Sequence, residues 1–158
     1  MKEYSQMLDS IDKAILNELQ LNSRISNVDL AQRVNLSPPA VHTRIKRLES
    51  LGYVSHYTAI LDREKVGYEM ICFINVTLAL HQPQHIDAFR EAIQAMPEVL
   101  ECHFLTGEYD YLLKVAIRSR QELEMFLMQR LTPIPGIARI NTSVVLGEVK
   151  NTTMLALE

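Results

Sequence analysis

This chain of 158 residues has no long hydrophobic run and only two cysteines. No apolar run approaches the roughly 20 residues of a membrane-spanning helix, and the first ten residues lack the apolar core of a signal peptide. We therefore expect a cytoplasmic protein. The two cysteines, Cys72 and Cys102, are too few and too far apart for a disulfide framework or a four-ligand zinc site. Both lie in strand-like runs, and we interpret them as small buried hydrophobic residues.

The sequence also lacks the residue combinations that most enzymes need. It contains no nucleophile with its base, no phosphate-binding loop and no cluster of metal ligands. The net charge of −3 argues against a protein that coats nucleic acid nonspecifically. A hydrophobic content of 47% with 22% charged residues is typical of a globular protein, and the length fits one domain or two small ones.

Positive charge is distributed unevenly along the chain. Residues 1–62 contain seven basic and seven acidic residues, whereas residues 63–158 contain nine basic and twelve acidic residues. Within residues 24–47, five basic residues accompany a single acidic one, Asp29, which gives a local net charge of +4. A local basic excess of this kind is typical of a segment that binds nucleic acid.

Residues 37–54 predict a helix with one apolar side and one basic side. Ser37 is a favourable N-cap, Pro38 suits the first turn, and Gly52 ends the helix. At about 100° per residue, a buried stripe separates from an outward-facing set. The stripe consists of Val41, Ile45 and Leu48, and the outward set of Pro39, His42, Thr43, Lys46, Arg47 and Ser50. Such a helix suits a DNA major groove, although for the helix alone an ordinary solvated basic face is the favoured interpretation.

The residues before this helix favour DNA binding. One helix is predicted to begin at Asp9 and a second, shorter one at Ser26, after which the turn at residues 35–36 leads directly into Ser37. Two helices joined by so short a turn, the second with a polar face, form a helix-turn-helix. Residues 53–61 are predicted to follow as a strand.

From Gly67 onward the pattern predicts a different fold. Strands are expected at residues 71–80, 99–105, 109–117 and 137–149, and helices at 84–96 and 120–131. Two successive βαβ units make a βαββαβ, ferredoxin-like plan. The predicted fold class is therefore α+β, with a helix-turn-helix domain in residues 1–62 and a ferredoxin-like domain in residues 63–158. Helices would cover one face of the sheet, and we expect homodimerisation through the other.

With these elements assigned, the chain resembles the leucine-responsive/asparagine-responsive (Lrp/AsnC) regulators from Leu8 to Leu157. The matching motifs are Asp9-x-x-Asp12-x-x-Ile15-Leu16, Leu36-Ser37, Arg44-Ile45-x-x-Leu48-Glu49, Met96-Pro-Glu-Val99, Thr106-Gly-Glu-Tyr-Asp110-Tyr and Lys150-x-Thr152-Thr153. The resemblance implies a winged helix-turn-helix that binds double-stranded DNA and a RAM-type domain that binds an effector and forms oligomers. It further implies transcription regulation without enzymatic activity or a cofactor. The effector would be an amino acid or a related small molecule bound between subunits, and homodimers would assemble into higher oligomers such as an octamer.

Candidate DNA-binding residues lie on the predicted recognition helix. Lys46 and Arg47 are expected to contact phosphate or a guanine edge, and Arg47→Ala to lower the salt dependence of binding by about one if Arg47 touches a phosphate. Arg44 has a second interpretation, an ion pair with Asp9 or Asp12. The full set is Ser37, Pro39, His42, Thr43, Arg44, Lys46 and Arg47.

The resemblance places the effector at the turn of residues 106–111. Gly107 would let backbone N–H groups approach a carboxylate, and Asp110 would receive an α-ammonium group, whereas the alternative is a plain hairpin turn. The expected effector residues are Leu105, Thr106, Gly107, Tyr109, Asp110, Tyr111, Thr152 and Thr153. The last two are expected less firmly, because family members often carry a proline where this chain has Ala156.

Two alternative functions stay open at the level of sequence. Some sirohaem decarboxylases resemble this two-domain architecture and use a histidine, for which His56 or His103 would be available, but no basic cluster in the C-terminal half would hold a tetrapyrrole. An architectural DNA-binding protein without an effector is the other, against which only the turn at Gly107 argues. Effector, operator, direction of regulation and oligomer size stay open as well.

Overall fold

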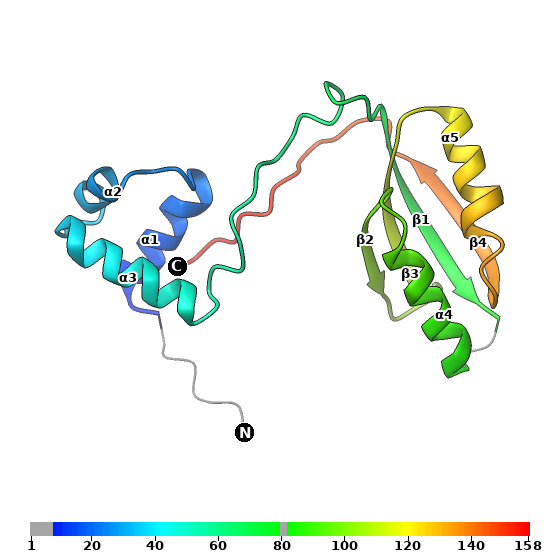
Figure 1. Cartoon of the computed structure of the whole chain (residues 1–158), viewed down its shortest axis with the longest axis horizontal. Helices are drawn as coiled ribbons and strands as arrows, with labels where there is room; N and C mark the ends of the chain where they lie inside the picture. Colours follow the sequence, from blue (N-terminus) through cyan, green and yellow to red (C-terminus); the bar gives the residue numbers. More distant parts are fainter. Residues whose placement is uncertain (1–7, 80–81) are drawn as a thin grey trace. The chain divides into compact units, whose positions relative to one another are not determined.

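The computed structural model describes residues 8–79 and 82–158, which form two compact units (Figure 1). The helical unit comprises the described residues up to Ile60 together with Lys150–Glu158, and the sheet unit comprises Leu61–Val149. Our boundary at residue 62 placed the whole C-terminus in the second domain. The structure instead groups the last nine residues with the helices, because they bind to the first helix.

Three helices build the helical unit: α1 (Ser10–Leu21), α2 (Asn27–Arg33) and α3 (Pro38–Ser50). Each begins after its predicted N-cap, whose side chain accepts a backbone N–H three residues on. These caps are Asp9 for α1, Ser26 for α2 and Ser37 for α3. Gly52 ends α3 with a φ of 77°, a conformation that glycine adopts without strain.

The core of the helical unit is small. Its buried members are Ile15, Leu16, Leu30, Ala31, Val41 and Leu48, and Leu157 from the C-terminal segment packs against them. The Gln20 side chain also forms two hydrogen bonds to the backbone of Leu155, donating to its carbonyl at 2.9 Å and accepting its N–H at 2.7 Å. The C-terminal segment thus adds apolar and polar contacts to a domain of marginal size.

The strand predicted at residues 53–61 is wrong. None of the described residues between α3 and the sheet unit is in a strand, and residues 55–61 are exposed. A strand needs a neighbour to pair its backbone groups, and no strand pairs with this segment among residues 8–79 and 82–158.

The sheet unit has the predicted βαββαβ order (Figure 1). It runs through β1 (Met70–Leu78), α4 (Pro83–Gln94), β2 (Val99–Phe104), β3 (Tyr111–Ile117), α5 (Arg120–Met125) with its π-helical continuation η1 (Phe126–Leu131), and β4 (Ile137–Val144). All pairs are antiparallel, in the sheet order β2-β3-β1-β4. The last strand ends at Val144 instead of the predicted residue 149, and the predicted inward position of Leu80 lies outside the described residues.

The core of the sheet unit lies between the sheet and its helices. Cys72, Ile74 and Val76 of β1 are fully buried there together with Phe89 of α4 and Phe126. The prediction that both cysteines are buried is wrong for Cys102, which is exposed. Its strand β2 forms the edge of the sheet, where less of the protein covers it.

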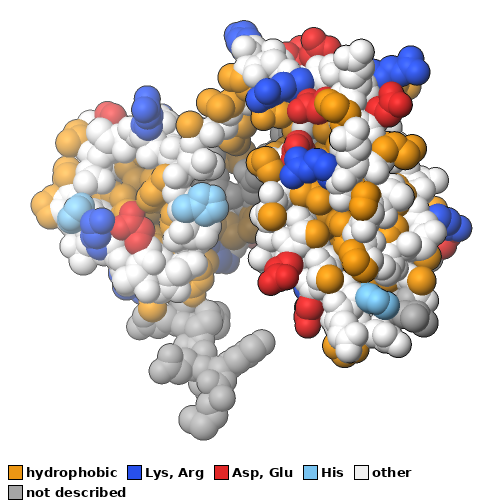
Figure 2. Space-filling view, turned by 45° about the vertical axis from the view of Figure 1, so that its right-hand side comes forward, with side chains coloured by type: hydrophobic (Ala, Val, Ile, Leu, Met, Phe, Trp, Pro, Cys, Tyr) orange, Lys and Arg blue, Asp and Glu red, His pale blue; other side chains and the backbone are white. Residues whose placement is uncertain are grey.

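The opposite face of the sheet carries a different mixture of side chains. Register places Phe73 of β1 beside Lys114 of β3 and Ser143 of β4, so that these three share one face. Phe73 is partly exposed, and other hydrophobic side chains of this unit lie among charged ones on its visible surface (Figure 2). No described helix is long and apolar enough to cross a membrane.

Candidate DNA-binding surface and effector turn

The outward face of α3 carries most of the predicted DNA-binding residues. Ser37, Pro39, His42, Thr43 and Lys46 are all exposed. His42 lies near the start of α2, with its Nδ1 atom 3.4 Å from the side-chain nitrogen of Asn27. The hydroxyl of Thr43 donates to the carbonyl of Pro39 at 3.0 Å. A helix of 13 residues therefore presents imidazole, hydroxyl and ammonium groups to solvent along one side.

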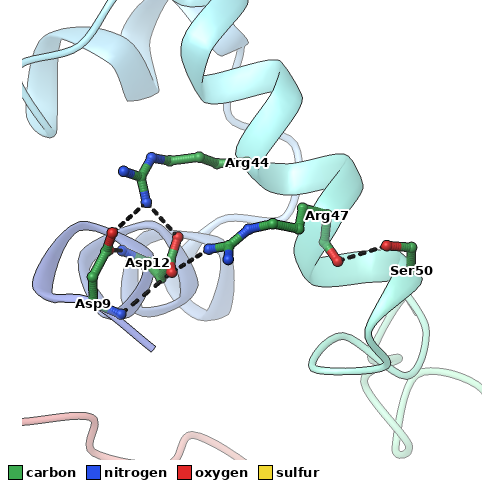
Figure 3. A network of polar contacts seen from close by, with 5 residues as sticks. All are labelled: Asp9, Asp12, Arg44, Arg47 and Ser50. Carbon is green, nitrogen blue, oxygen red and sulfur yellow. Dashed lines mark hydrogen bonds and ion pairs between the residues drawn. The ribbon is translucent and has the colours of Figure 1, made fainter. Parts of the chain in front are cut away.

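The two arginines of α3 turn instead toward α1 (Figure 3). Arg44 donates to Asp9 at 2.7 Å and to Asp12 at 2.8 Å, which confirms its interpretation as an ion-pairing residue. Arg47 donates to the other carboxylate oxygen of Asp12. We call these four residues the α1–α3 ion cluster. Asp12 is only 1% exposed, whereas Arg44 is 28% and Arg47 37% exposed.

The titration of the acidic residues reflects this arrangement. Burial by itself raises the pKa of Asp12, but the hydrogen bonds from Arg47 and Arg44 outweigh it and hold the pKa below its ordinary value. The pKa of Asp9 is also lowered, first by the backbone N–H of Asp12 and then by Arg44. Both carboxylates are therefore ionised at neutral pH, and the cluster as a whole has no net charge.

The local excess of positive charge seen in the sequence is largely neutralised in space. Within residues 24–47, Arg24 is the one basic residue that has no ion pair among the described residues. The other four basic residues of this window are paired with acidic ones: Arg33 with Glu18, Arg44 with Asp9 and Asp12, Lys46 with Glu49, and Arg47 with Asp12. Basic and acidic side chains accordingly lie next to each other on the visible face of this unit (Figure 2). The acidic partners lie outside the sequence window, so the linear count overstated the basic surface.

The turn between β2 and β3 contains the predicted effector residues of the sheet unit. The N–H of Leu105 donates to the carbonyl of Asp110 at 2.8 Å and closes the turn. Gly107 is exposed and has a φ of 125°, which residues with side chains rarely adopt. Asp110 anchors the turn to β1, because its carboxylate accepts the N–H of Leu78 at 2.7 Å.

Other predicted effector residues have different surroundings. Tyr111 is a core residue whose ring lies 4.5 Å from that of Phe89, and its hydroxyl has no hydrogen-bond partner among the described residues. Thr152 and Thr153 are exposed and belong to the helical unit, unlike the turn. The hydroxyl of Thr152 accepts the N–H of Met154 at 3.1 Å.

One residue at the turn was missed by reasoning from the sequence. Arg139 of β4 pairs with Glu108, and its guanidinium lies 4.8 Å from the ring centre of Tyr109. The hydrogen bond to Glu108 raises the pKa of Arg139. The sequence predicts the strand that carries Arg139, but only the strand order brings this residue to the turn.

Two family models match this chain and together cover most of it. Residues 8–55 match the winged helix-turn-helix DNA-binding domain, and residues 71–155 match the Lrp/AsnC ligand binding domain. The chain belongs to the Lrp/AsnC family. It is a DNA-binding transcriptional regulator with a ligand-binding domain, and the predicted fold class is confirmed.

Curated relatives of this Lrp/AsnC regulator are also named as regulators. The leucine-responsive regulatory protein of Haemophilus influenzae is 40% identical over 157 residues, which cover 99% of this chain and 95% of that protein. The protein of the same name from Escherichia coli (strain K12) is 38% identical over 151 residues, covering 96% of this chain and 92% of that protein.

Solved structures are similar as well. A transcriptional regulator from Neisseria meningitidis, in complex with L-Met, has a TM-score of 0.92 at 37% identity and covers 95% of this chain and 97% of its own. AsnC of Escherichia coli has a TM-score of 0.86 at 26% identity, with coverages of 94% and 98%. Because these relatives are regulators, the Lrp/AsnC regulator described here is not an enzyme, and the sirohaem decarboxylase alternative is set aside.

Proposed function

We propose that this regulator reads double-stranded DNA with the outward face of α3. The observation that carries the proposal is the exposure of His42, Thr43 and Lys46 along one side of a capped helix, whose other side is fixed to α1 and α2. Base edges are read by such side chains near the start of a recognition helix. Ser37 and Pro39 lie at that start, whereas Arg44 holds the helix in place.

The effector in this proposal is an amino acid that binds at the turn of residues 105–111. The L-Met complex of the Neisseria regulator and the leucine-responsive relatives favour methionine and leucine as first candidates. The open space around Gly107 would let backbone N–H groups approach the carboxylate of an amino acid, and the anchored carboxylate of Asp110 would receive its ammonium group. For Thr152 and Thr153, which belong to the helical unit, a role in effector binding stays a prediction from the family resemblance.

The proposal includes homodimers that pack through the helix-free sheet face and assemble further. Phe73 of this face is partly exposed and Leu112 half-buried, whereas the helix-facing side is closed by its own core. Burying such a face against a second copy is the ordinary solution for a one-sided sheet. A location in the cytoplasm follows from the proposed contact with DNA.

The DNA part is tested by selecting genomic fragments on the purified protein, without amino acid and with leucine or methionine. We expect enriched fragments with half-sites about 10 base pairs, or a multiple of that, apart. An effector would change the fragments or their yield. Recovery of random fragments under every condition would contradict sequence-specific regulation and favour an architectural role.

The effector part is tested by thermal unfolding with each of the twenty amino acids. A ligand at 100 times its dissociation constant adds about 2.7 kcal/mol to the stability of the state that binds it. We expect a raised melting temperature with leucine, methionine or a chemically similar amino acid. No shift with any of the twenty would exclude the proposed class of effector.

A further inference from the structure

Asp12 binds both arginines of the recognition helix, but the two depend on it to different degrees. Arg44 has a second carboxylate, Asp9, at 2.7 Å. For Arg47, Asp12 is the only carboxylate partner among the described residues. Loss of the charge on Asp12 would therefore leave Arg44 paired and release Arg47 alone.

The position of Arg47 on α3 makes its release consequential. At about 100° per residue, it lies roughly 130° from the centre of the buried stripe and next to the outward face. Its side chain is 37% exposed, yet its guanidinium folds back to the buried Asp12 (Figure 3). Rotation about the side-chain bonds would carry the same group into solvent, on the side from which Lys46, 65% exposed, already projects.

We propose that Asp12 is a positioning residue that withholds Arg47 from DNA phosphates, and thereby limits the affinity of this regulator for DNA of any sequence. The proposal rests on DNA binding through α3. Phosphate contacts act through counterion release and carry no sequence information. A guanidinium that is already paired adds little to this term. Moving it to a phosphate would remove the charged partner from one oxygen of a buried carboxylate, which would then keep only the N–H of Asp9 at 3.3 Å, and this loss is unfavourable.

The restraint has a functional consequence. A genome offers a vast excess of nonspecific sites, so a regulator finds its operators only if its affinity for random sequence stays low. Exposed groups such as His42 and Thr43 can discriminate bases, whereas an extra free arginine would strengthen binding everywhere. Asp12 thus acts on specificity through Arg47 without touching DNA.

The test measures binding to a short random-sequence duplex by fluorescence anisotropy, at salt concentrations from about 50 to 200 mM. For Asp12→Asn we expect the slope of log affinity against log salt to steepen by about 0.9 per bound protomer, and binding to be roughly eightfold tighter at 0.1 M salt. Arg47→Gln should leave the slope unchanged. The double variant Asp12→Asn/Arg47→Gln should return to the slope of the unaltered protein.

Asp9→Asn is the matched control. It removes one negative charge from the same ion cluster, keeps a favourable N-cap and leaves the pair between Arg47 and Asp12 in place. We expect its slope to equal that of the unaltered protein. Circular dichroism and thermal unfolding establish that each variant is folded.

Three results would overturn the proposal: a folded Asp12→Asn variant with an unchanged slope, an equal increase in Asp9→Asn, or a slope lowered by about 0.9 in Arg47→Gln. If Asp12→Asn does not fold, Arg47→Gln decides alone, since an unchanged slope supports the withheld arginine. Absence of binding by the unaltered protein at low salt would instead overturn DNA binding through α3, and this proposal with it.

Discussion

The two hydrogen bonds between Gln20 and Leu155 predict that Gln20→Ala loosens the C-terminal segment from α1. Each bond contributes about 0.5–1.5 kcal/mol. Both are exposed to solvent, which places them at the lower end of this range, and alanine is a slightly better helix former than glutamine. We therefore expect a net loss of about 1 kcal/mol in the free energy that holds residues 150–158 in place.

Amide hydrogen exchange measures this loss directly. A change of about 1 kcal/mol corresponds to a roughly fivefold larger open population. The Leu155 N–H also loses its own acceptor in this variant, so it should exchange at least about fivefold faster. Gln32→Ala is the matched control, since Gln32 lies exposed on α2 and its side chain forms no hydrogen bond with another described residue. It should leave the exchange of Leu155 unchanged. Unchanged exchange in Gln20→Ala, or an equal change in both variants, would refute the proposed role of these bonds.

Three further predictions concern the ion cluster and the turns. The pKa of Asp12 in the folded state lies below 3.8, so its ion pairs stabilise the helical unit above that pH and are lost as the pH falls through the folded-state pKa. The free energy of unfolding should therefore depend less steeply on acidic pH in Asp12→Asn than in the unaltered protein. Gly107→Ala should strain the turn and weaken amino acid binding in calorimetry, whereas Gly147→Ala, with no positive φ, should not. Gly136→Ala should lower the melting temperature, since its Cβ would lie 2.8 Å from that of His85.

Local signals predicted the helices and one of their contacts. Ser26 and Ser37 cap their helices because a hydroxyl next to free N–H groups acts within three residues. The pairing of Arg44 with α1 was foreseen since Arg44 lies at the edge of the buried stripe. Arg47 was assigned to the DNA-facing set because a helical wheel gives the direction of the Cα atom only. It does not show that the long side chain reaches back to Asp12 of α1.

The remaining differences arise from distant parts of the chain. Nothing near Gln20 in the sequence indicates that Leu155 lies beside it. The exposure of Cys102 follows from the edge position of β2, which depends on the order of all four strands. Residues 53–61 are rich in β-branched and aromatic residues, but such a composition alone does not supply a pairing partner.

The most direct test of DNA reading by α3 is the affinity of a His42→Ala/Lys46→Gln variant for the genomic fragments recovered by the unaltered protein. Both side chains are exposed, so the variant should keep its melting temperature. We expect its affinity for the selected fragments to approach that for random sequence. An unchanged preference for those fragments, in a variant that folds normally, would contradict the account.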